Sequence, residues 1–352
     1  MRRKVSTLCS FVLLALVSAP FVNSSEARKP GTPGAPGYHL LKKIEVGGEG
    51  GWDYLSIDSG ARRLYVSRST RVMVFDVDTG KSVGEIPDTP GVHGIAIAVD
   101  LGRGFTSNGR EGSVTIFELK TLKPISKVKV GTNPDCILYD PATHRVFAFN
   151  RGSSDVSAID AKTGEVAGLI PLGGHPEFAT SDGKGMLFVN LDNKSEIVAI
   201  DSKNLVAKAH WPVAPGEDPS GMAIDRKNNR LFSVCGNKRM TVMDASSGKV
   251  MADVPIGAGP DAAAFDPETN LAFSSNGDGT LTVVHQDSAD KYSVIENVPT
   301  QRGARTMALD PKTHNIFLAA VQYAPPPAAT TEQPRPRPAM LPNSFVILVF
   351  GK

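Results

Sequence analysis

Apolar residues along this chain form short groups of four to six positions, alternating or clustered, between turns rich in Asp, Gly and Pro. One stretch contains four such groups in succession, at residues 54–57, 63–67, 72–76 and 82–86. This spacing is typical of β-strands joined by tight turns, and no long run has the 3.6-residue period of an amphipathic helix. The pattern therefore predicts an all-β protein whose strands come in sets of four.

The sets of strands recur along the chain. The column that opens each unit contains Asp53, His93, Asp135, Glu177, Ser220, Asp261 and Arg305, at spacings of 40 to 44 residues. A turn follows within a few residues and is usually led by Asp. A repeat of this length with four strands per unit is the signature of a β-propeller. Seven columns predict a seven-bladed β-propeller with four antiparallel strands per blade.

The two ends of the repeat region complement each other. Residues 39–47 resemble the outer strand at 124–131 but follow no inner strands, whereas the last unit, from Arg305, has only three strands. We therefore expect residues 39–46 to pair with 345–350, so that the N-terminal strand closes the last blade and removes an open sheet edge.

The first 27 residues are typical of a secretory signal peptide. Three basic residues precede a largely apolar run, and Ser25-Glu26-Ala27 provides a cleavage site. The predicted organisation is a signal peptide at 1–27, a flexible segment at 28–37 and the propeller at 38–352. The protein is then periplasmic or secreted, with no transmembrane span after cleavage; an uncleaved membrane anchor is the alternative.

A Pro-rich stretch, at 323–342, interrupts the last blade where other units need only a few residues. Such composition buries little apolar surface, so we expect a poorly ordered surface insertion, or alternatively a lid or docking arm across one face. Outside this insertion the composition is ordinary. The formal net charge is +2, and acidic and basic residues are mixed along the chain, so no basic patch indicates nucleic-acid binding. Cys136 and Cys235 fall in non-adjacent blades, which predicts buried thiols rather than a disulfide.

The repeat unit has a recognisable motif. Blades three, five and six carry it best; the copy in blade three runs from Pro134-Asp135 through Asp140-Pro141 to Phe147, and the copy in blade six from Pro260-Asp261 through Asp266-Pro267 to Phe273. This unit resembles the YncE-like, YVTN-repeat seven-bladed propellers, over about residues 38–352. The resemblance implies an exported or periplasmic propeller but no catalytic residues, because the shared positions are turn and core residues.

The opening column also supplies the candidate site, because the ring brings residues about 40 positions apart to one channel mouth. The candidate ligand-binding ring is Asp53, His93, Asp135, Glu177, Asp261 and Arg305. Further polar residues are expected around it: Trp52, Arg68, Arg110, Asn150, Arg151, His175, Asn190, Asp192, Lys194 and Asn276. Crowded carboxylates suit a hard cation such as Ca²⁺ or acid–base chemistry. The alternative is a solvated channel whose polar residues bond nearby backbone amides.

Two functions follow from this site. The first is a non-enzymatic binding scaffold of the cell envelope, acting as a monomer on a protein, a glycan or a small ligand. The second is a lactonase-like hydrolase that uses the channel carboxylates, with or without a divalent cation. No cofactor is predicted, because the histidines and cysteines lack metal-site spacing and no phosphate loop or nucleophile motif is present.

Overall fold

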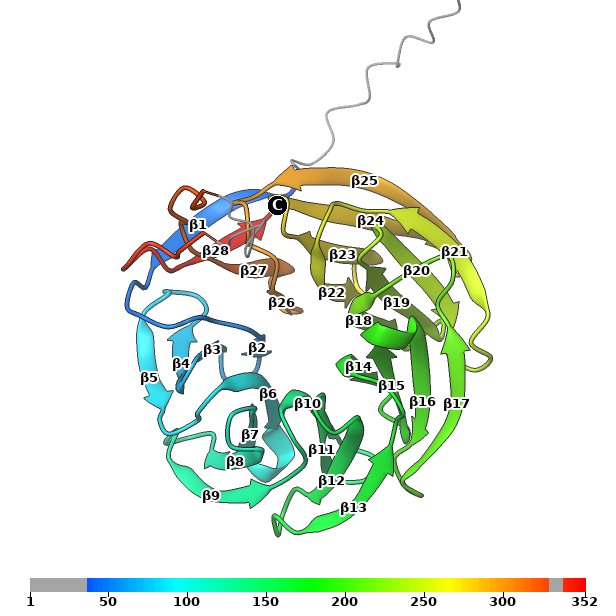
Figure 1. The fold of residues 1–352 in the computed structure, drawn as a ribbon. Coiled ribbons are helices and arrows are strands. Elements are labelled where there is room, and N and C mark those ends of the chain that lie inside the picture. Colours follow the sequence, from blue (N-terminus) through cyan, green and yellow to red (C-terminus); the bar gives the residue numbers. More distant parts are fainter. Residues whose placement is uncertain (1–36, 329–337) are drawn as a thin grey trace, which may run out of the picture. The chain divides into compact units, whose positions relative to one another are not determined.

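The computed structural model describes residues 37–328 and 338–352, so the predicted signal peptide lies outside the described residues. These residues form seven four-stranded antiparallel sheets arranged as blades around a ring (Figure 1). The described part of the chain contains two 3₁₀ turns, η1 (Val99–Leu101) and η2 (Asp192–Lys194), and no α-helix. Within it, no helix is long and apolar enough to cross a bilayer. The prediction of an all-β, seven-bladed propeller is confirmed.

Each of the first six blades is built from consecutive strands, from the channel outward. Blade 1 contains β2 (Leu55–Asp58), β3 (Arg63–Arg68), β4 (Arg71–Asp76) and β5 (Ser82–Ile86). Blade 2 contains β6 (Val92–Ala98), β7 (Arg103–Asn108), β8 (Ser113–Glu118) and β9 (Pro124–Lys129). Blade 3 contains β10 (Pro134–Asp140), β11 (Arg145–Asn150), β12 (Asp155–Asp160) and β13 (Val166–Pro171).

The remaining blades continue around the ring. Blade 4 contains β14 (Pro176–Ser181), β15 (Met186–Leu191), β16 (Glu196–Asp201) and β17 (Val206–Pro212). Blade 5 contains β18 (Pro219–Asp225), β19 (Arg230–Cys235), β20 (Arg239–Asp244) and β21 (Val250–Pro255). Blade 6 contains β22 (Pro260–Asp266), β23 (Leu271–Asn276), β24 (Thr280–Ser288) and β25 (Lys291–Pro299). Blade 7 contains β26 (Met307–Asp310), β27 (Asn315–Ala320), β28 (Val346–Gly351) and β1 (His39–Glu45).

Blade 7 is completed by the N-terminal strand, as predicted. β1 pairs antiparallel with β28, with His39 opposite Gly351 and Glu45 opposite Val346. The backbone N–H groups of Val46 and Gly47 extend this contact by donating to the carbonyl oxygen of Phe345. The outermost strand of the last blade therefore comes from the other end of the repeat region, which closes the ring.

The apolar core rests on an aromatic residue that recurs in every blade. The third residue of each second strand is aromatic and at most 1% exposed: Tyr65, Phe105, Phe147, Phe188, Phe232, Phe273 and Phe317. Large rings at one repeated depth fill the space between neighbouring blades, where each ring removes much apolar surface from water. Cys136 and Cys235 are free thiols within the same core, which confirms that they are buried small hydrophobes.

The Asp-led turns bond their own backbone. In blade 5, Oδ1 of Asp225 accepts hydrogen bonds from the backbone N–H groups of Lys227 and Asn228, which fixes the turn between the first and second strands. In blade 2 the first strand ends at Ala98 instead of Asp, and there η1 makes the turn and is followed by Gly102, whose φ of 63° suits glycine.

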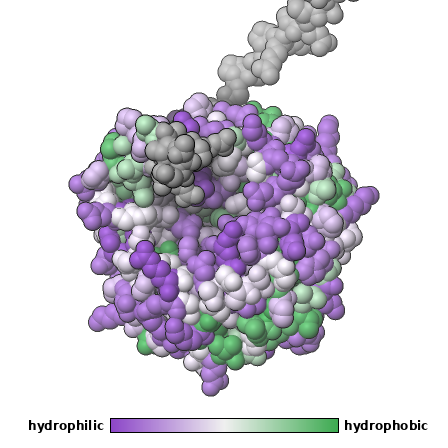
Figure 2. Space-filling model, in the orientation of Figure 1, coloured by the Kyte–Doolittle hydropathy of each residue, from purple (hydrophilic) through white to green (hydrophobic). Residues whose placement is uncertain are grey.

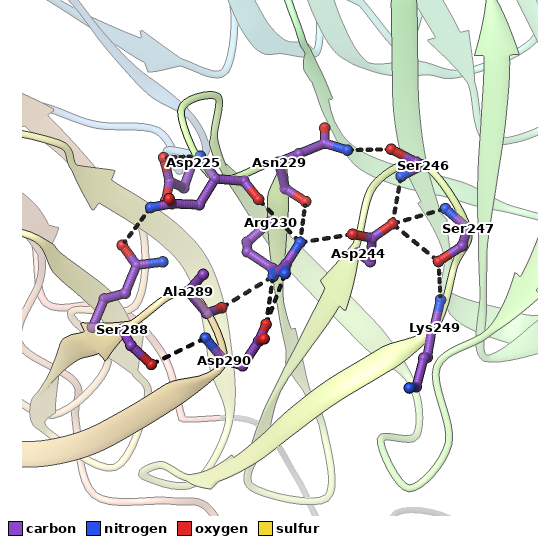
Figure 3. A network of polar contacts seen from close by, with 12 residues as sticks. Asp225, Asn229, Arg230, Asp244, Ser246, Ser247, Lys249, Ser288, Ala289 and Asp290 are labelled. Carbon is purple, nitrogen blue, oxygen red and sulfur yellow. Dashed lines mark hydrogen bonds and ion pairs between the residues drawn. The ribbon is translucent and has the colours of Figure 1, made fainter.

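Arg230 lies at the same end of blade 5 as these turns (Figure 3). Its guanidinium donates to Oδ2 of Asp244 at 2.7 Å and to Oδ1 of Asp290 at 2.7 Å. It also donates to the backbone carbonyl oxygens of Ala289, Asn228 and Asn229. We call Arg230, Asp244 and Asp290 the Arg230 cluster. It ties the turns of blade 5 to the β24–β25 hairpin of blade 6.

The Pro-rich insertion is described only at its ends, because residues 329–337 lie outside the described residues. Tyr323 and Met340 form an antiparallel bridge, and the backbone N–H of Ala324 donates to the carbonyl oxygen of Ala339. The two ends of the insertion are therefore paired with each other, which differs from the irregular chain that its composition predicts.

Candidate functional site

The candidate ring residues occupy a repeated irregularity in the innermost strands. In blades 2 to 6 the pairing of the first and second strands shifts register at the position of the column residue. In blade 3, for example, the shift lies between Pro134 and Ile137 and includes Asp135. A bulge frees a residue from the ladder and redirects its side chain. The sequence therefore positions His93, Asp135, Glu177, Ser220 and Asp261 at the channel mouth through the same local device.

Three ring residues from successive blades meet directly. Nδ1 of His93 lies 2.5 Å from Oδ2 of Asp53 and 3.9 Å from Oδ1 of Asp135. One ligand-type atom from each residue falls within 4.8 Å of the others. Burial disfavours the charged imidazolium, but the hydrogen bond to Asp53 and the charge of Asp135 outweigh it and raise the pKa of His93. We call these three residues the Asp–His–Asp cluster.

The carboxylates of Asp135 and Asp261 are largely buried, and burial raises both of their pKa values. The pKa of Asp135 is raised to about 6, with His93 opposing the shift and Asp53 adding to it. The pKa of Asp261 is raised to about 7, with Arg305 opposing the shift and the carboxylates of Asp53 and Asp135 adding to it. Nη1 of Arg305 is 4.0 Å from Asp261, and its side chain is 61% exposed. Arg305 therefore neutralises Asp261 only weakly.

Glu177 has a closer cationic partner than Asp261 has, and this partner comes from a loop of blade 3. Nη1 of Arg151 lies 2.5 Å from Oε2 of Glu177, and the same guanidinium donates to Asp192. Burial and the charge of Asp135 raise the pKa of Glu177 to about 8, although the ion pair with Arg151 favours its ionised form. Arg151, which bridges two carboxylates, is the main cationic neighbour of this side of the ring.

Oδ2 of Asp261 and the hydroxyl of Tyr54 are among the buried side-chain oxygens that have no hydrogen-bond partner in the part of the chain that the structure describes. Tyr54 packs its ring 4.4 Å from that of Phe178, and burial followed by the charge of Asp135 raises its pKa well above the usual range. Tyr54 directly follows Asp53 in the sequence, and that adjacency was the only signal that could have included it among the candidates.

An open recess of about 290 Å³ adjoins the Asp–His–Asp cluster. Its lining includes Trp52, Asp53, His93, Arg110 and Asn133. Figure 2 shows a hollow near the centre of the face in view, with hydrophilic residues around much of it. Its lining also includes Gly51, Gly91 and Gly109, which have no side chains to fill the recess, so it can admit a small molecule.

The structure brings all six candidate ring residues to one mouth, but it does not leave all the predicted surrounding residues accessible. Arg68, Asn150, Asn190 and Asn276 are completely buried. Asn150 donates to Asp155 and Ser157 of the neighbouring strand, so it ties the second strand of its blade to the third. These four side chains are therefore buried within their blades and do not form part of the accessible surface around the ring. The reason is that the second strand enters the core just before its loop.

Comparisons with known proteins support the fold. No protein-family model and no curated protein sequence matches the chain. Solved structures do resemble it at the level of fold. A chain of Kuenenia stuttgartiensis hydrazine synthase has a TM-score of 0.65 at 17% identity and covers 83% of this chain and 96% of its own length. A chain of the mitotic checkpoint complex has a TM-score of 0.73 at 14% identity, covering 97% and 99%.

A third similar structure is that of the RRP9 WD40 repeats, with a TM-score of 0.72 at 9% identity, covering 89% of this chain and 97% of that one. The three structures place the chain among the β-propellers. Their low identity shows the fold alone. Membership of the YncE-like family stays a prediction from the repeat motif.

Proposed function

We propose that this protein is an exported, non-enzymatic binding propeller that holds a small polar ligand at its channel mouth. The observation that carries the proposal is the recess lined by Asp53 and His93, whose imidazole lies 3.9 Å from the largely buried carboxylate of Asp135. Burial raises the pKa of Asp135 to about 6 and that of Asp261, another acid of the ring, to about 7. A buried carboxylate oxygen without a donor is costly. A ligand that brings positive charge or hydrogen-bond donors removes that cost on binding.

The chemistry of the recess favours a cationic or hydroxyl-rich ligand, such as an amine or a glycan. Asp53 and Asn133 offer acceptors for hydroxyl or ammonium groups, and Trp52 adds an aromatic surface at the same recess. Arg110 offers donors on the same lining, so a ligand with both kinds of group is accommodated. We infer that the protein acts as a monomer, because β1 closes the ring and leaves no incomplete blade.

A melting experiment on metal-free protein tests this binding. Amines and oligosaccharides that bind should raise the melting temperature with the logarithm of their concentration. The double variant Asp135→Asn/Asp261→Asn should lose that rise. Asp253 is an exposed residue of β21, the outer strand of blade 5, and the control variant Asp253→Asn should keep the rise. If no compound raises the melting temperature, or if the double variant responds like the parent, binding at this mouth is refuted.

Export rests on the charged start, the apolar run and the Ser25-Glu26-Ala27 site. Protein recovered from the cell envelope should begin near Arg28, as read by N-terminal sequencing. An intact Met1 on protein from the cytoplasm would refute export. The result is independent of whether the channel mouth binds a ligand.

A lactonase-like hydrolase is the second candidate, and the contact between His93 and Asp53 favours it. A histidine whose Nδ1 is held by a carboxylate is positioned to act as a general base through Nε2. Hydrolysis of a panel of lactones, with loss of kcat in His93→Gln, would support this function over simple binding. Equal background rates for parent and variant would leave only the binding function.

A further inference from the structure

We propose that Asp53, His93 and Asp135 bind one divalent transition-metal ion, of the Zn²⁺ or Mn²⁺ class, at the channel mouth. This inference deepens the proposed function and rests on the same mouth being open to ligands. The three residues come from blades 1, 2 and 3 and lie about 40 positions apart, so no short sequence motif contains them.

The geometry of the cluster is close to that of a metal site. The ligand-type atoms of the three residues all lie within 4.8 Å of one another, with Nδ1 of His93 at 2.5 Å from Asp53 and 3.9 Å from Asp135. Bonds of about 2.0–2.2 Å from a metal to N and O ligands place those atoms roughly 3–3.5 Å apart. Small side-chain movements on a rigid ring are enough to reach that spacing.

The electrostatics of the mouth also favour a bound cation. Asp135 is 8% exposed, and its nearest cationic group is His93 at 3.9 Å. Oδ2 of Asp261 is buried at the same mouth without a partner in the described residues. Buried carboxylates are stabilised when they are paired or coordinate a metal. A divalent ion in the Asp–His–Asp cluster neutralises both of its carboxylates at once.

The donor set favours a transition metal over Ca²⁺ or Mg²⁺. Calcium and magnesium take oxygen ligands, whereas an imidazole nitrogen suits Zn²⁺ and related ions, and Mn²⁺ accepts carboxylates as well. Three protein ligands leave a further coordination position open, as in catalytic zinc sites. Here the recess lined by Trp52 and Arg110 lies beside Asp53 and His93, so that position can accept water or an oxygen of a ligand.

The competing arrangement is a protonated His93 that bridges the two carboxylates with no metal. Calorimetric titration of untagged, chelator-treated protein with Zn²⁺ and with Mn²⁺ separates the two. We expect one ion per chain and binding at least tenfold tighter than that of Ca²⁺ or Mg²⁺. The variants His93→Gln and Asp135→Asn should each weaken binding at least tenfold while keeping the circular dichroism of the parent.

Two variants serve as matched controls. His285 forms a similar pair with Asp287, with Nδ1 and Oδ1 2.8 Å apart, but on the outer part of blade 6. Asp287 is the carboxylate partner of His285 in that pair. His285→Gln and Asp287→Asn should bind Zn²⁺ within about threefold of the parent. Cobalt used as a probe should give visible d–d absorption bands that His93→Gln shifts or removes, as expected if His93 belongs to the coordination sphere.

The proposal is overturned if neither Zn²⁺ nor Mn²⁺ binds. It is also overturned if His285→Gln loses as much affinity as His93→Gln, or if Ca²⁺ binds as tightly as Zn²⁺. If metal-free protein still binds amines or glycans in those cases, the metal site fails while the proposed function stands. If Zn²⁺ binds as expected but no organic ligand does, the metal site stands and small-ligand binding fails.

Discussion

Two carboxylates at opposite ends of the blades show how this protein separates a structural cluster from a candidate site. Asp244, in the Arg230 cluster, accepts hydrogen bonds from Arg230, from the backbone N–H groups of Ser246 and Ser247 and from the Ser247 hydroxyl (Figure 3). Burial opposes its ionisation, but these donors outweigh burial and lower its pKa.

Asp261, at the channel mouth, has the opposite environment. Its Oδ2 has no donor among the described residues, and its closest cation, Arg305, is 4.0 Å away and mostly exposed. Burial then dominates and raises its pKa to about 7. The ionised form of an aspartate is therefore stabilised at Asp244, where donors surround it, and not at Asp261, where they are missing. Of the two, Asp261 is the candidate for binding a ligand.

The largest effect should come from breaking the satisfied cluster. Arg230→Ala should lower the free energy of unfolding by about 3 kcal/mol, because it leaves Asp244 and several carbonyl oxygens without their donor. Urea denaturation measures the loss. Arg230→Lys keeps the charge but not the planar fork, so it should fall between parent and Ala variant. A loss below about 1 kcal/mol for Arg230→Ala would contradict the structural role of this cluster.

The channel mouth should respond in the opposite direction. In metal-free protein at pH 8, Asp261→Asn should raise the free energy of unfolding by about 2 kcal/mol, because it removes a carboxylate whose charged form is disfavoured in the fold. The raised pKa means that the folded state holds the proton longer than the unfolded state. The contribution of Asp261 to the free energy of unfolding is therefore fully present below about pH 4 and is lost as the pH rises through about 7.

Below about pH 4 the gain from Asp261→Asn should nearly vanish, because Asp261 is then protonated in both the folded and the unfolded protein. Denaturation at the two pH values measures this difference. A variant that is less stable than the parent at pH 8 would show that Asp261 is a satisfied structural residue like Asp244.

A smaller effect is expected at Asp244. Asp244→Asn should lower the free energy of unfolding by about 1–2 kcal/mol at pH 7, because the amide keeps one acceptor oxygen but loses the charge that faces Arg230. The lowered pKa gives a stability contribution that is present above the unfolded carboxyl pKa and is lost as pH falls through the folded value. In acid, variant and parent should converge. Divergence on acidification would reverse the predicted sign.

The smallest effect should come from a charge pair that is neither buried nor part of a cluster. Nζ of Lys43 lies 2.8 Å from Glu45 on β1, with side chains 40% and 69% exposed. Lys43→Ala should change the free energy of unfolding by less than about 0.5 kcal/mol. A loss comparable to that of Arg230→Ala would mean that the pair holds the closing strand, which the exposure of both groups argues against.

The fold could be predicted from the sequence because its determinants are local and repeated. Alternating apolar residues specify strands, an Asp supplies the turn by bonding backbone amides such as that of Lys227, and the same unit recurs at a constant period. Even the closure of blade 7 could be predicted, since a strand without partners at one end matches a missing strand at the other. The repeat also predicted which column faces the channel.

The tertiary structure alone decided how the members of that column differ. Their identities gave no sign that His93 contacts both Asp53 and Asp135, that Arg151 bridges Glu177 and Asp192, or that Asp261 has an unpaired oxygen. Among the residues expected around the column, the sequence also did not indicate that Arg110 is accessible whereas Asn150 is buried. These facts depend on distances across blades and on burial, which set the electrostatics. The sequence determines which side chains reach the mouth. Packing determines which of their carboxylates lack a neutralising cation or a hydrogen-bond donor.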